Sequence, residues 1–157
     1  MTTFLYGLIT AVLTAVDLWC KSYIEKNYEK GQEKKILKDK VTLRRVHNKG
    51  MALNAGSKYP EAVRVLSGLV CGIVGVYSVF VWTKEQCPWK KLGAACTLSG
   101  AISNTYDRFV RKYVVDYFGF QTKWEKFNRV TFNLGDIFIF LGSVILVAAE
   151  IVGLKQK

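Results

Sequence analysis

Histidine is almost absent from this sequence, and no cluster of metal-ligating residues can be found in it. The only histidine is His47, and the four cysteines are Cys20, Cys71, Cys87 and Cys96. Structural zinc sites use Cys and His at short, regular spacings, which these positions do not have. A nucleophilic cysteine would need a base beside it. We therefore predict structural thiols, no metal and no other cofactor.

Other common catalytic and binding motifs are also missing. There is no glycine-rich phosphate loop and no Gly-x-Ser-x-Gly elbow. Acidic residues are scarce, because 12 Asp and Glu stand against 23 Lys and Arg, which gives a formal net charge of +11. Such a charge can attract nucleic acid or anionic lipid headgroups. Nothing in the sequence is typical of a nucleic-acid-binding fold, so we expect no nucleic-acid partner.

Long apolar stretches, in contrast, are present and predict membrane spans. A helix needs about 20 residues to cross a hydrocarbon core of roughly 30 Å. A cleaved signal peptide is disfavoured for the first stretch, because no Lys or Arg precedes it and three more stretches follow. A soluble bundle is disfavoured because the charged residues crowd into 21–58 and 107–130. With extra turns allowed at the short stretches, the predicted spans are residues 4–21, 62–82, 90–107 and 134–154.

These spans predict one integral membrane domain over residues 1–157, an all-α protein with a four-transmembrane-helix bundle. The loop at 22–59 is too long for a simple tether. Within this loop, residues 41–46 have the β-branched content of a strand and run into the turn signal at 48–50. We therefore expect a small β element in the loop after the first helix, lying on the membrane surface.

Small residues recur inside the predicted spans. Gly68 and Gly72 have the Gly-x-x-x-Gly spacing, and Gly100, Ala101 and Ser103 follow in the third span. Small side chains let helix backbones approach closely in lipid. They predict tight packing between the spans.

Two aspartates adjoin the predicted spans at places where an ionised carboxylate is costly. Asp116 follows the third span and Asp136 begins the fourth. A charged Asp in the hydrocarbon costs about 2.5–3.5 kcal/mol even on lenient insertion scales, so such acids indicate functional sites. Two neighbouring carboxylates share one proton and can together activate a water molecule, as in aspartic proteases. Asn104, Arg108 and Asn133 are placed to orient this pair or its substrate.

Five short polar motifs lie near the ends of the predicted spans. They are Asp17–Lys21, Asn48–Leu53, Gly100–Arg108, Val114–Tyr117 and Phe132–Asp136. In order and spacing they resemble the motifs of the lipoprotein signal peptidase family, also called signal peptidase II, over nearly the whole chain. The resemblance implies an aspartyl membrane endopeptidase that removes the signal peptide of bacterial prolipoproteins just before a lipid-modified cysteine.

The resemblance also implies roles for single residues. It makes Asp116 and Asp136 the catalytic dyad, supported by Asn104, Arg108 and Asn133.

The remaining motif residues take supporting roles. Asn48 and Gly50 correspond to a loop motif near the substrate. Asp17 and Lys21 correspond to a polar pair on the first helix, which we interpret as structural support. Asp107 is a competing carboxylate, but the family pattern pairs the acid of the Val-Val-Asp motif with the later one, so we predict a structural role for Asp107.

The chain departs from the usual family pattern at three places. Ser103 stands where the family usually has Gly, Gly135 stands where it usually has Ala, and Met51–Leu53 replaces Ala-Ala-Phe or a similar sequence. None of these changes removes an acid. They suggest a divergent branch with changes in the substrate pocket or in the recognition of the residues before the lipidated cysteine.

The charge distribution conflicts with the orientation that the resemblance implies. The family places both termini inside the bacterial cell and the dyad at the extracytoplasmic face of the inner membrane. Residues 21–64 carry 12 Lys and Arg and residues 108–129 carry 6, against 5 elsewhere, so the positive-inside rule favours the opposite orientation. We follow the family, because the rule is weaker for folded loops.

Two functions from different classes follow from these observations. The first is the peptidase, with diacylglyceryl-modified prolipoproteins and membrane lipids as partners and a monomer as the expected state. The alternative is a non-catalytic membrane protein on the same scaffold that binds lipidated peptides or a partner.

Overall fold

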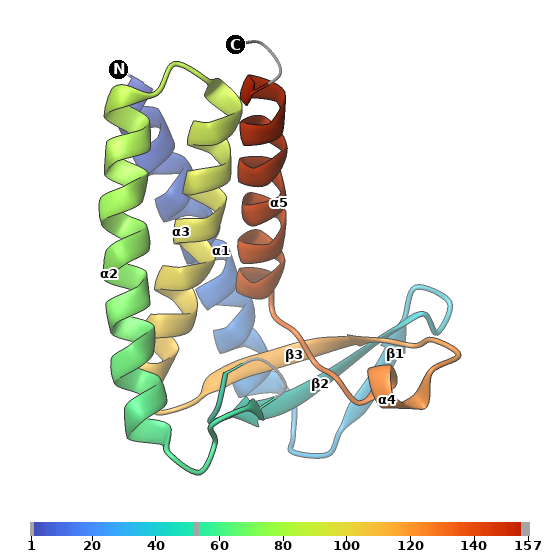
Figure 1. The fold of residues 1–157 in the computed structure, drawn as a ribbon. Coiled ribbons are helices and arrows are strands. Elements are labelled where there is room, and N and C mark those ends of the chain that lie inside the picture. The colour runs from blue at the N-terminus through green and yellow to red at the C-terminus, as the bar shows by residue number, and fades with distance from the viewer. Residues whose placement is uncertain (1, 52–53, 155–157) are drawn as a thin grey trace.

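Four long helices form a bundle, and a small sheet projects from one end of it (Figure 1). The computed structural model describes residues 2–51 and 54–154. Ala52 and Leu53 of the loop motif, and residues 1 and 155–157 of the predicted domain, lie outside the described residues. The bundle helices are α1 (Thr2–Asn27), α2 (Pro60–Lys84), α3 (Pro88–Val110) and α5 (Leu134–Leu154). The remaining elements are β1 (Glu33–Ile36), β2 (Val41–Asn48), β3 (Val114–Phe120) and the short α4 (Glu125–Asn128).

Three of the helices are long and apolar enough to cross a membrane. Within the described residues these spans are Thr3–Asn27, Pro60–Lys84 and Leu134–Gly153. They contain the first and second predicted spans and cover the fourth except for its last residue. The third predicted span, 90–107, falls in α3, which is 23 residues long but more polar. The prediction of four spans is therefore not confirmed by length and apolarity.

The polarity of α3 has a physical explanation in its position. Figure 1 shows α3 between α2 and α5, and it contacts all three other bundle helices. Its polar side chains Ser99, Ser103, Asn104 and Asp107 are buried. Polar groups on an interior helix can pair with groups on its neighbours, so α3 does not need the apolar surface that a lipid-facing helix requires.

Glycines allow α3 and α5 to approach closely. A Cβ atom on Gly142 of α5 would lie 2.6 Å from the carbonyl oxygen of Gly93, and one on Gly100 of α3 would collide with the carbonyl oxygen of Gly135. The Gly-x-x-x-Gly pair of α2 behaves differently. A Cβ on Gly68 would meet only the Phe109 ring. A Cβ on Gly72 would have no described atom within 4 Å outside the backbone of its own helix and its chain neighbours. The predicted close backbone approach at Gly72 is therefore wrong.

The sheet is antiparallel with the strand order β1-β2-β3. The predicted β element in the loop after the first helix is confirmed, because β1 and β2 lie there and β2 begins at Val41. The third strand was not predicted: β3 comes from the segment after α3, so the fold is not purely helical and the sheet is not confined to one loop. This strand carries Asp116 away from the end of α3 and against β2, where Val46 is its partner in the ladder.

We expect the two kinds of glycine to respond oppositely to alanine. Gly142→Ala should lower the midpoint of thermal unfolding in detergent, because overpacking against the backbone of α3 costs about 1–3 kcal/mol. Gly72→Ala should leave the midpoint unchanged or raise it slightly, because alanine is the better helix former by about 1 kcal/mol. Equal midpoints for the two variants would contradict the close contact between α3 and α5.

Candidate active site

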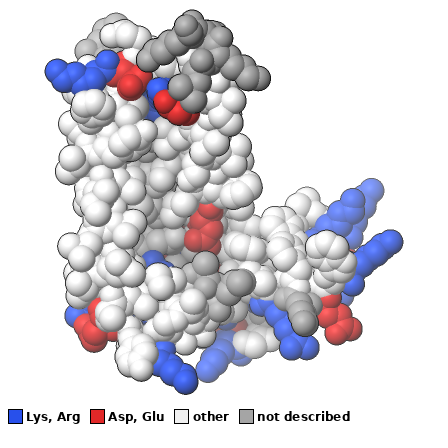
Figure 2. Space-filling view, in the orientation of Figure 1, with Lys and Arg blue, Asp and Glu red and all other residues white. Residues whose placement is uncertain are grey.

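Asp116 and Asp136 line one cavity of about 640 Å³. Asp116 comes from β3, and Asp136 lies in the first turn of α5. Most of the cavity wall is apolar and comes from α2, α3 and α5, including Leu66, Val70 and Ile139. Figure 2 shows acidic atoms in an otherwise largely uncharged wall of the bundle, near the level where the sheet projects, whereas basic side chains gather at the end of the sheet.

The Asp116 carboxylate is buried and accepts a hydrogen bond at each oxygen. Asn133 Nδ2 donates to Oδ1 at 2.7 Å, and Asn48 Nδ2 donates to Oδ2 at 3.0 Å. Burial, and after it the nearby Asp136 carboxylate, raise the pKa of Asp116 to about 7, although the two amides act against this shift. The cost of burying the charge therefore outweighs the two hydrogen bonds, and Asp116 titrates near neutral pH.

The Asp136 carboxylate is held in the same way. Asn104 Nδ2 donates to Oδ1 at 2.9 Å, and the backbone N–H of Asn133 donates to Oδ2 at 3.1 Å. Asn133 therefore contacts both acids, one through its side chain and one through its backbone. This single residue ties β3 to the start of α5.

Three asparagine side chains donate to the two acids, and each has its orientation set by a donor at its own oxygen. An amide whose oxygen accepts a hydrogen bond must turn its NH₂ group the other way. The carboxylates therefore face three NH₂ groups that cannot flip without losing a bond. The orienting donors are Gly50 N for Asn48 at 2.9 Å, Asp136 N for Asn133 at 2.9 Å, and Lys21 Nζ for Asn104 at 2.7 Å.

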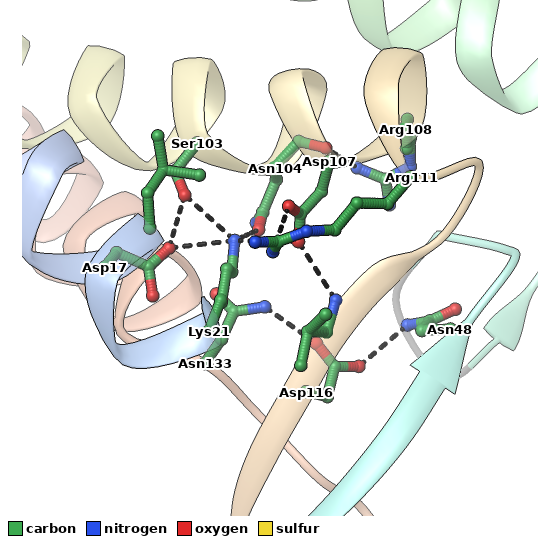
Figure 3. A network of polar contacts seen from close by, with 12 residues as sticks. Asp17, Lys21, Asn48, Ser103, Asn104, Asp107, Arg108, Arg111, Asp116 and Asn133 are labelled. Atoms are coloured by element: carbon green, nitrogen blue, oxygen red, sulfur yellow. Dashed lines mark hydrogen bonds and ion pairs between the residues drawn. The ribbon is translucent and has the colours of Figure 1, made fainter. Parts of the chain in front are cut away.

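Lys21 lies fully buried between α1 and α3, surrounded by polar groups (Figure 3). Its Nζ is 2.9 Å from Asp17 Oδ2 and 3.6 Å from Asp107 Oδ2, and it donates to Ser103 Oγ at 2.9 Å. Asp17 also accepts hydrogen bonds from Ser103 Oγ and from the Tyr117 hydroxyl. Neither Lys21 nor Asp17 is among the residues that line the cavity. These contacts support the interpretation of Asp17 and Lys21 as structural.

Asp107 fixes the start of β3. Its Oδ2 accepts the backbone N–H of Val115 at 3.0 Å, and its Oδ1 pairs with Arg111 at 2.7 Å (Figure 3). Asp107 is fully buried and is not part of the cavity wall. It positions the residue next to Asp116, which is a structural role.

Arg108 lines the cavity but has no hydrogen bond to the acids, and Gly50 is one of its partners. Arg108 Nη2 donates to the Gly50 carbonyl at 2.8 Å and Nη1 donates to the Asn104 carbonyl at 3.3 Å. A Cβ on Gly50 would lie 2.5 Å from backbone atoms of Asn54 and Ala55, so the loop closes only around glycine here. Arg108 thus ties the loop after β2 to α3.

No group of three or more His, Cys, Asp or Glu in the described part of the chain could hold a metal ion. The arrangement is instead one of two acids, three amides and an arginine around an apolar cavity. Such a set of groups can hold one shared proton and one water molecule next to a bound chain.

Comparison with known proteins decides the family. Residues 9–152 match the family model described as signal peptidase (SPase) II. The chain belongs to the signal peptidase II family. It is therefore related to proteases that act at the membrane, and the resemblance seen in the sequence motifs is confirmed.

Individual relatives agree with the family model. The chain is 30% identical to the lipoprotein signal peptidase of Mesorhizobium japonicum, over 97% of this chain and 88% of that protein. It is 31% identical to the lipoprotein signal peptidase of Lactococcus lactis subsp. cremoris, over 95% of each. A solved bacterial membrane enzyme structure matches the fold with a TM-score of 0.84 and 18% identity, over 97% of this chain and 90% of that one.

Sequence reasoning gave no role to Ser103 beyond packing and none to Tyr117, although both contact Asp17. The helical spacing in α3 could have indicated a role for Ser103, because Ser103 and Asp107 are four residues apart and share a helix face. Nothing local could have found Tyr117, whose partner is 100 residues away.

Two departures from the usual family pattern meet at one oxygen atom. Ser103 Oγ lies 2.6 Å from Asp17 Oδ2, and a Cβ on Gly135 would lie 2.7 Å from the same oxygen. The hydroxymethyl group of Ser103 on α3 therefore occupies space beside the Asp17 carboxylate. Gly135 on α5 leaves space beside the same carboxylate, because it has no Cβ atom.

We expect Ser103 and Gly135 to be energetically coupled. Gly135→Ala alone should destabilise the protein, because Asp17 is held by Lys21 and cannot move aside. With Ser103→Gly added, Asp17 gains room, and the double variant should lose about 1 kcal/mol less than the sum of the two single losses. Unfolding midpoints in detergent for the four proteins measure the coupling.

A matched pair supplies the control for this cycle. Ser99 is buried one turn earlier on α3, and its hydroxyl donates to the Cys96 carbonyl. Gly135→Ala and Ser99→Gly should be additive. Equal coupling in both cycles would mean that the contact at Asp17 is not its cause.

Proposed function

We propose that this protein is an aspartic endopeptidase that removes the signal peptide from bacterial prolipoproteins just before the lipid-modified cysteine. Asp116 and Asp136 are its catalytic dyad. The observation that carries the proposal is the pair of carboxylates on one cavity, buried Asp116 and half-buried Asp136, joined by Asn133, in a chain of the signal peptidase II family.

The dyad works through one shared proton. Because the pKa of Asp116 is raised to about 7, we assign one proton to the pair near neutral pH and a negative charge to the other carboxylate. The anionic member takes a proton from the attacking water, and the protonated member donates its proton to the carbonyl oxygen of the scissile bond. As the tetrahedral intermediate collapses, a carboxyl group returns a proton to the leaving amine nitrogen. No covalent intermediate with the protein is formed.

The surrounding polar groups have separate tasks in this scheme. The amides of Asn48, Asn104 and Asn133 keep the acceptor oxygens of the dyad in place, which is the preorganisation that catalysis requires. Arg108 lines the cavity, and its Nε is buried without a hydrogen-bond partner among the described residues. A buried unpaired donor costs about 1–3 kcal/mol. We assign the guanidinium group of Arg108 to the positioning of the bound substrate chain.

The apolar part of the cavity fits the lipidated end of the substrate. The walls from α2, α3 and α5 form a groove of side chains that would face acyl chains or the apolar signal helix. A diacylglyceryl group anchors its peptide in the bilayer by about 0.8 kcal/mol per buried methylene. Diacylglyceryl-modified prolipoproteins are the proposed substrates, and membrane lipids the proposed surroundings of a monomer.

The proposed location is the bacterial inner membrane, with all four bundle helices crossing it and the dyad at the extracytoplasmic face. The first residues of α1 and the last of α5 lie at the end of the bundle opposite to the sheet (Figure 1), which fits four crossings. The sheet then rests on the outer surface. Its basic side chains would meet anionic lipid headgroups there, at roughly 1 kcal/mol per well-placed charge.

Removing either acid should abolish cleavage. Asp116→Asn and Asp136→Asn should each reduce cleavage of a lipidated precursor to below about a hundredth, because the two acids act as one unit. Both proteins should still be folded in membranes. Asp107→Asn should retain more activity, although it lowers stability, because it loosens only the start of β3.

A surface acid gives the matched control for the dyad variants. Asp39 is exposed in the turn between β1 and β2, and Asp39→Asn should cleave at the unchanged rate. Full activity in either dyad variant would remove that acid from the catalytic mechanism, whereas no cleavage by the wild-type protein would leave the non-catalytic binding protein as the function. An inactive Asp107→Asn with an active Asp116→Asn would reassign the acids.

Labelling of single cysteines should settle the orientation. In a variant without the four native cysteines, Lys38→Cys next to the sheet should react with a membrane-impermeant thiol reagent added to intact cells. Lys84→Cys at the end of α2 should react only after permeabilisation. The reverse pattern would place the dyad inside the cell and would agree with the positive-inside rule instead.

A further inference from the structure

A second, smaller cavity meets the first at Asp116. It has a volume of about 260 Å³. Asn48, Asp116, Val130 and Thr131 line both cavities, whereas Asp136 lines only the first. The dyad therefore lies where two spaces join.

The two cavities have different walls. The first is built largely by apolar side chains of the bundle helices. The second has no residue from those helices, and its wall comes from β2, from the loop after it, from Asp116 of β3 and from the segment that precedes α5. The polar residues that line the second cavity but not the first are His47, Asn54 and Arg129. It leads from the dyad toward the polar, sheet-bearing end of the molecule.

Only one charge in the second cavity is available to a ligand at its outer end. Asp116 is buried and lies at the inner end, where the cavities meet. His47 Nε2 contacts Glu25 at 3.0 Å, and its ring stacks on Tyr113 with centroids 3.9 Å apart. Arg129 is exposed and makes no ion pair with any described residue. The cavity thus has a free guanidinium group at its mouth.

We propose that the second cavity binds the residues that follow the cleavage position, and that Arg129 gives it a preference for acidic side chains there. This inference rests on the proposed function. A chain whose scissile bond lies at the dyad must continue on both sides of it. The apolar groove fits the signal-peptide side and the lipid, which leaves the second cavity for the chain that leaves toward water.

The size and chemistry of the cavity fit this occupant. Two extended residues are about 7 Å long, at roughly 3.5 Å of chain per residue. This length is comparable with the width of a cavity of about 260 Å³. Asn54 and Thr131 offer hydrogen-bonding groups to an extended backbone, and the Arg129 guanidinium can bind a carboxylate with two parallel hydrogen bonds. These residues are specificity determinants, separate from the dyad.

A charge exchange between enzyme and substrate tests the inference. Two lipidated precursors are prepared that differ only in the two residues after the modified cysteine, which are both Asp in one and both Lys in the other. The wild-type protein should cleave the Asp precursor with about a fivefold higher kcat/KM, the size expected for one partly exposed ion pair. Arg129→Glu should invert the ratio, and Arg129→Lys should keep most of the preference.

The design separates misfolding and general electrostatics from a specific site. Arg129→Glu should gain rate on the Lys precursor, which a misfolded variant cannot do. Lys123→Glu makes the same charge change on a neighbouring exposed residue that does not line either cavity, and it should leave the ratio unchanged at 0.15 M salt, where the screening length is about 8 Å.

The outcomes also separate this inference from the proposed function. A wild-type ratio near one, or the same ratio in Arg129→Glu, overturns the inference, whereas cleavage of both precursors leaves the peptidase intact. If the wild-type protein cleaves neither precursor, the peptidase proposal falls and the inference falls with it.

Discussion

The buried ammonium group of Lys21 is the constraint on which the rest of the site depends. A fully buried cation is tolerated only when it is paired and hydrogen-bonded, because its desolvation costs several kcal/mol. Lys21 has Asp17 on its own helix, and Ser103, Asn104 and Asp107 on α3. These four partners set the distance and rotation between α1 and α3. Removing any one of them leaves charge or hydrogen-bonding capacity unmatched inside the bundle.

Short, oriented contacts connect the Lys21 ammonium group and its partners to the two acids. Lys21 turns the amide of Asn104 toward Asp136, and Asp107 holds the backbone of Val115 beside Asp116. Asn133 then joins the two acids. Both carboxylates are thus placed by groups that are themselves fixed, on helices and a strand and not on loops alone. The raised pKa of Asp116 follows chiefly from the burial that these contacts impose.

The position of α3 explains why the most polar of the long helices lies at the centre. Three lipid-facing helices surround it in part, and glycines at the contact with α5 bring the two backbones together. The small distance between α3 and α5 is what places Asn104 within reach of Asp136. At Asp17, Ser103 on α3 contacts the carboxylate oxygen that a Cβ atom on Gly135 of α5 would also meet.

Local properties of the sequence were enough to predict the lipid-facing helices, the strand at 41–46 and the two candidate acids, Asp116 and Asp136. Apolar length, β-branched content and the cost of a charge near lipid are all properties of a short segment, so they can be read without knowing what lies opposite. The third strand, the interior position of α3 and the contacts at Gly72 could not be read in this way. They depend on partners far along the chain: Asn48 meets Asp116 across 68 residues, and Lys21 meets Asn104 across 83. Which hydrogen bonds form there is decided by how the helices pack, because only the packed bundle brings the donors and acceptors together and removes the water that would otherwise compete for them.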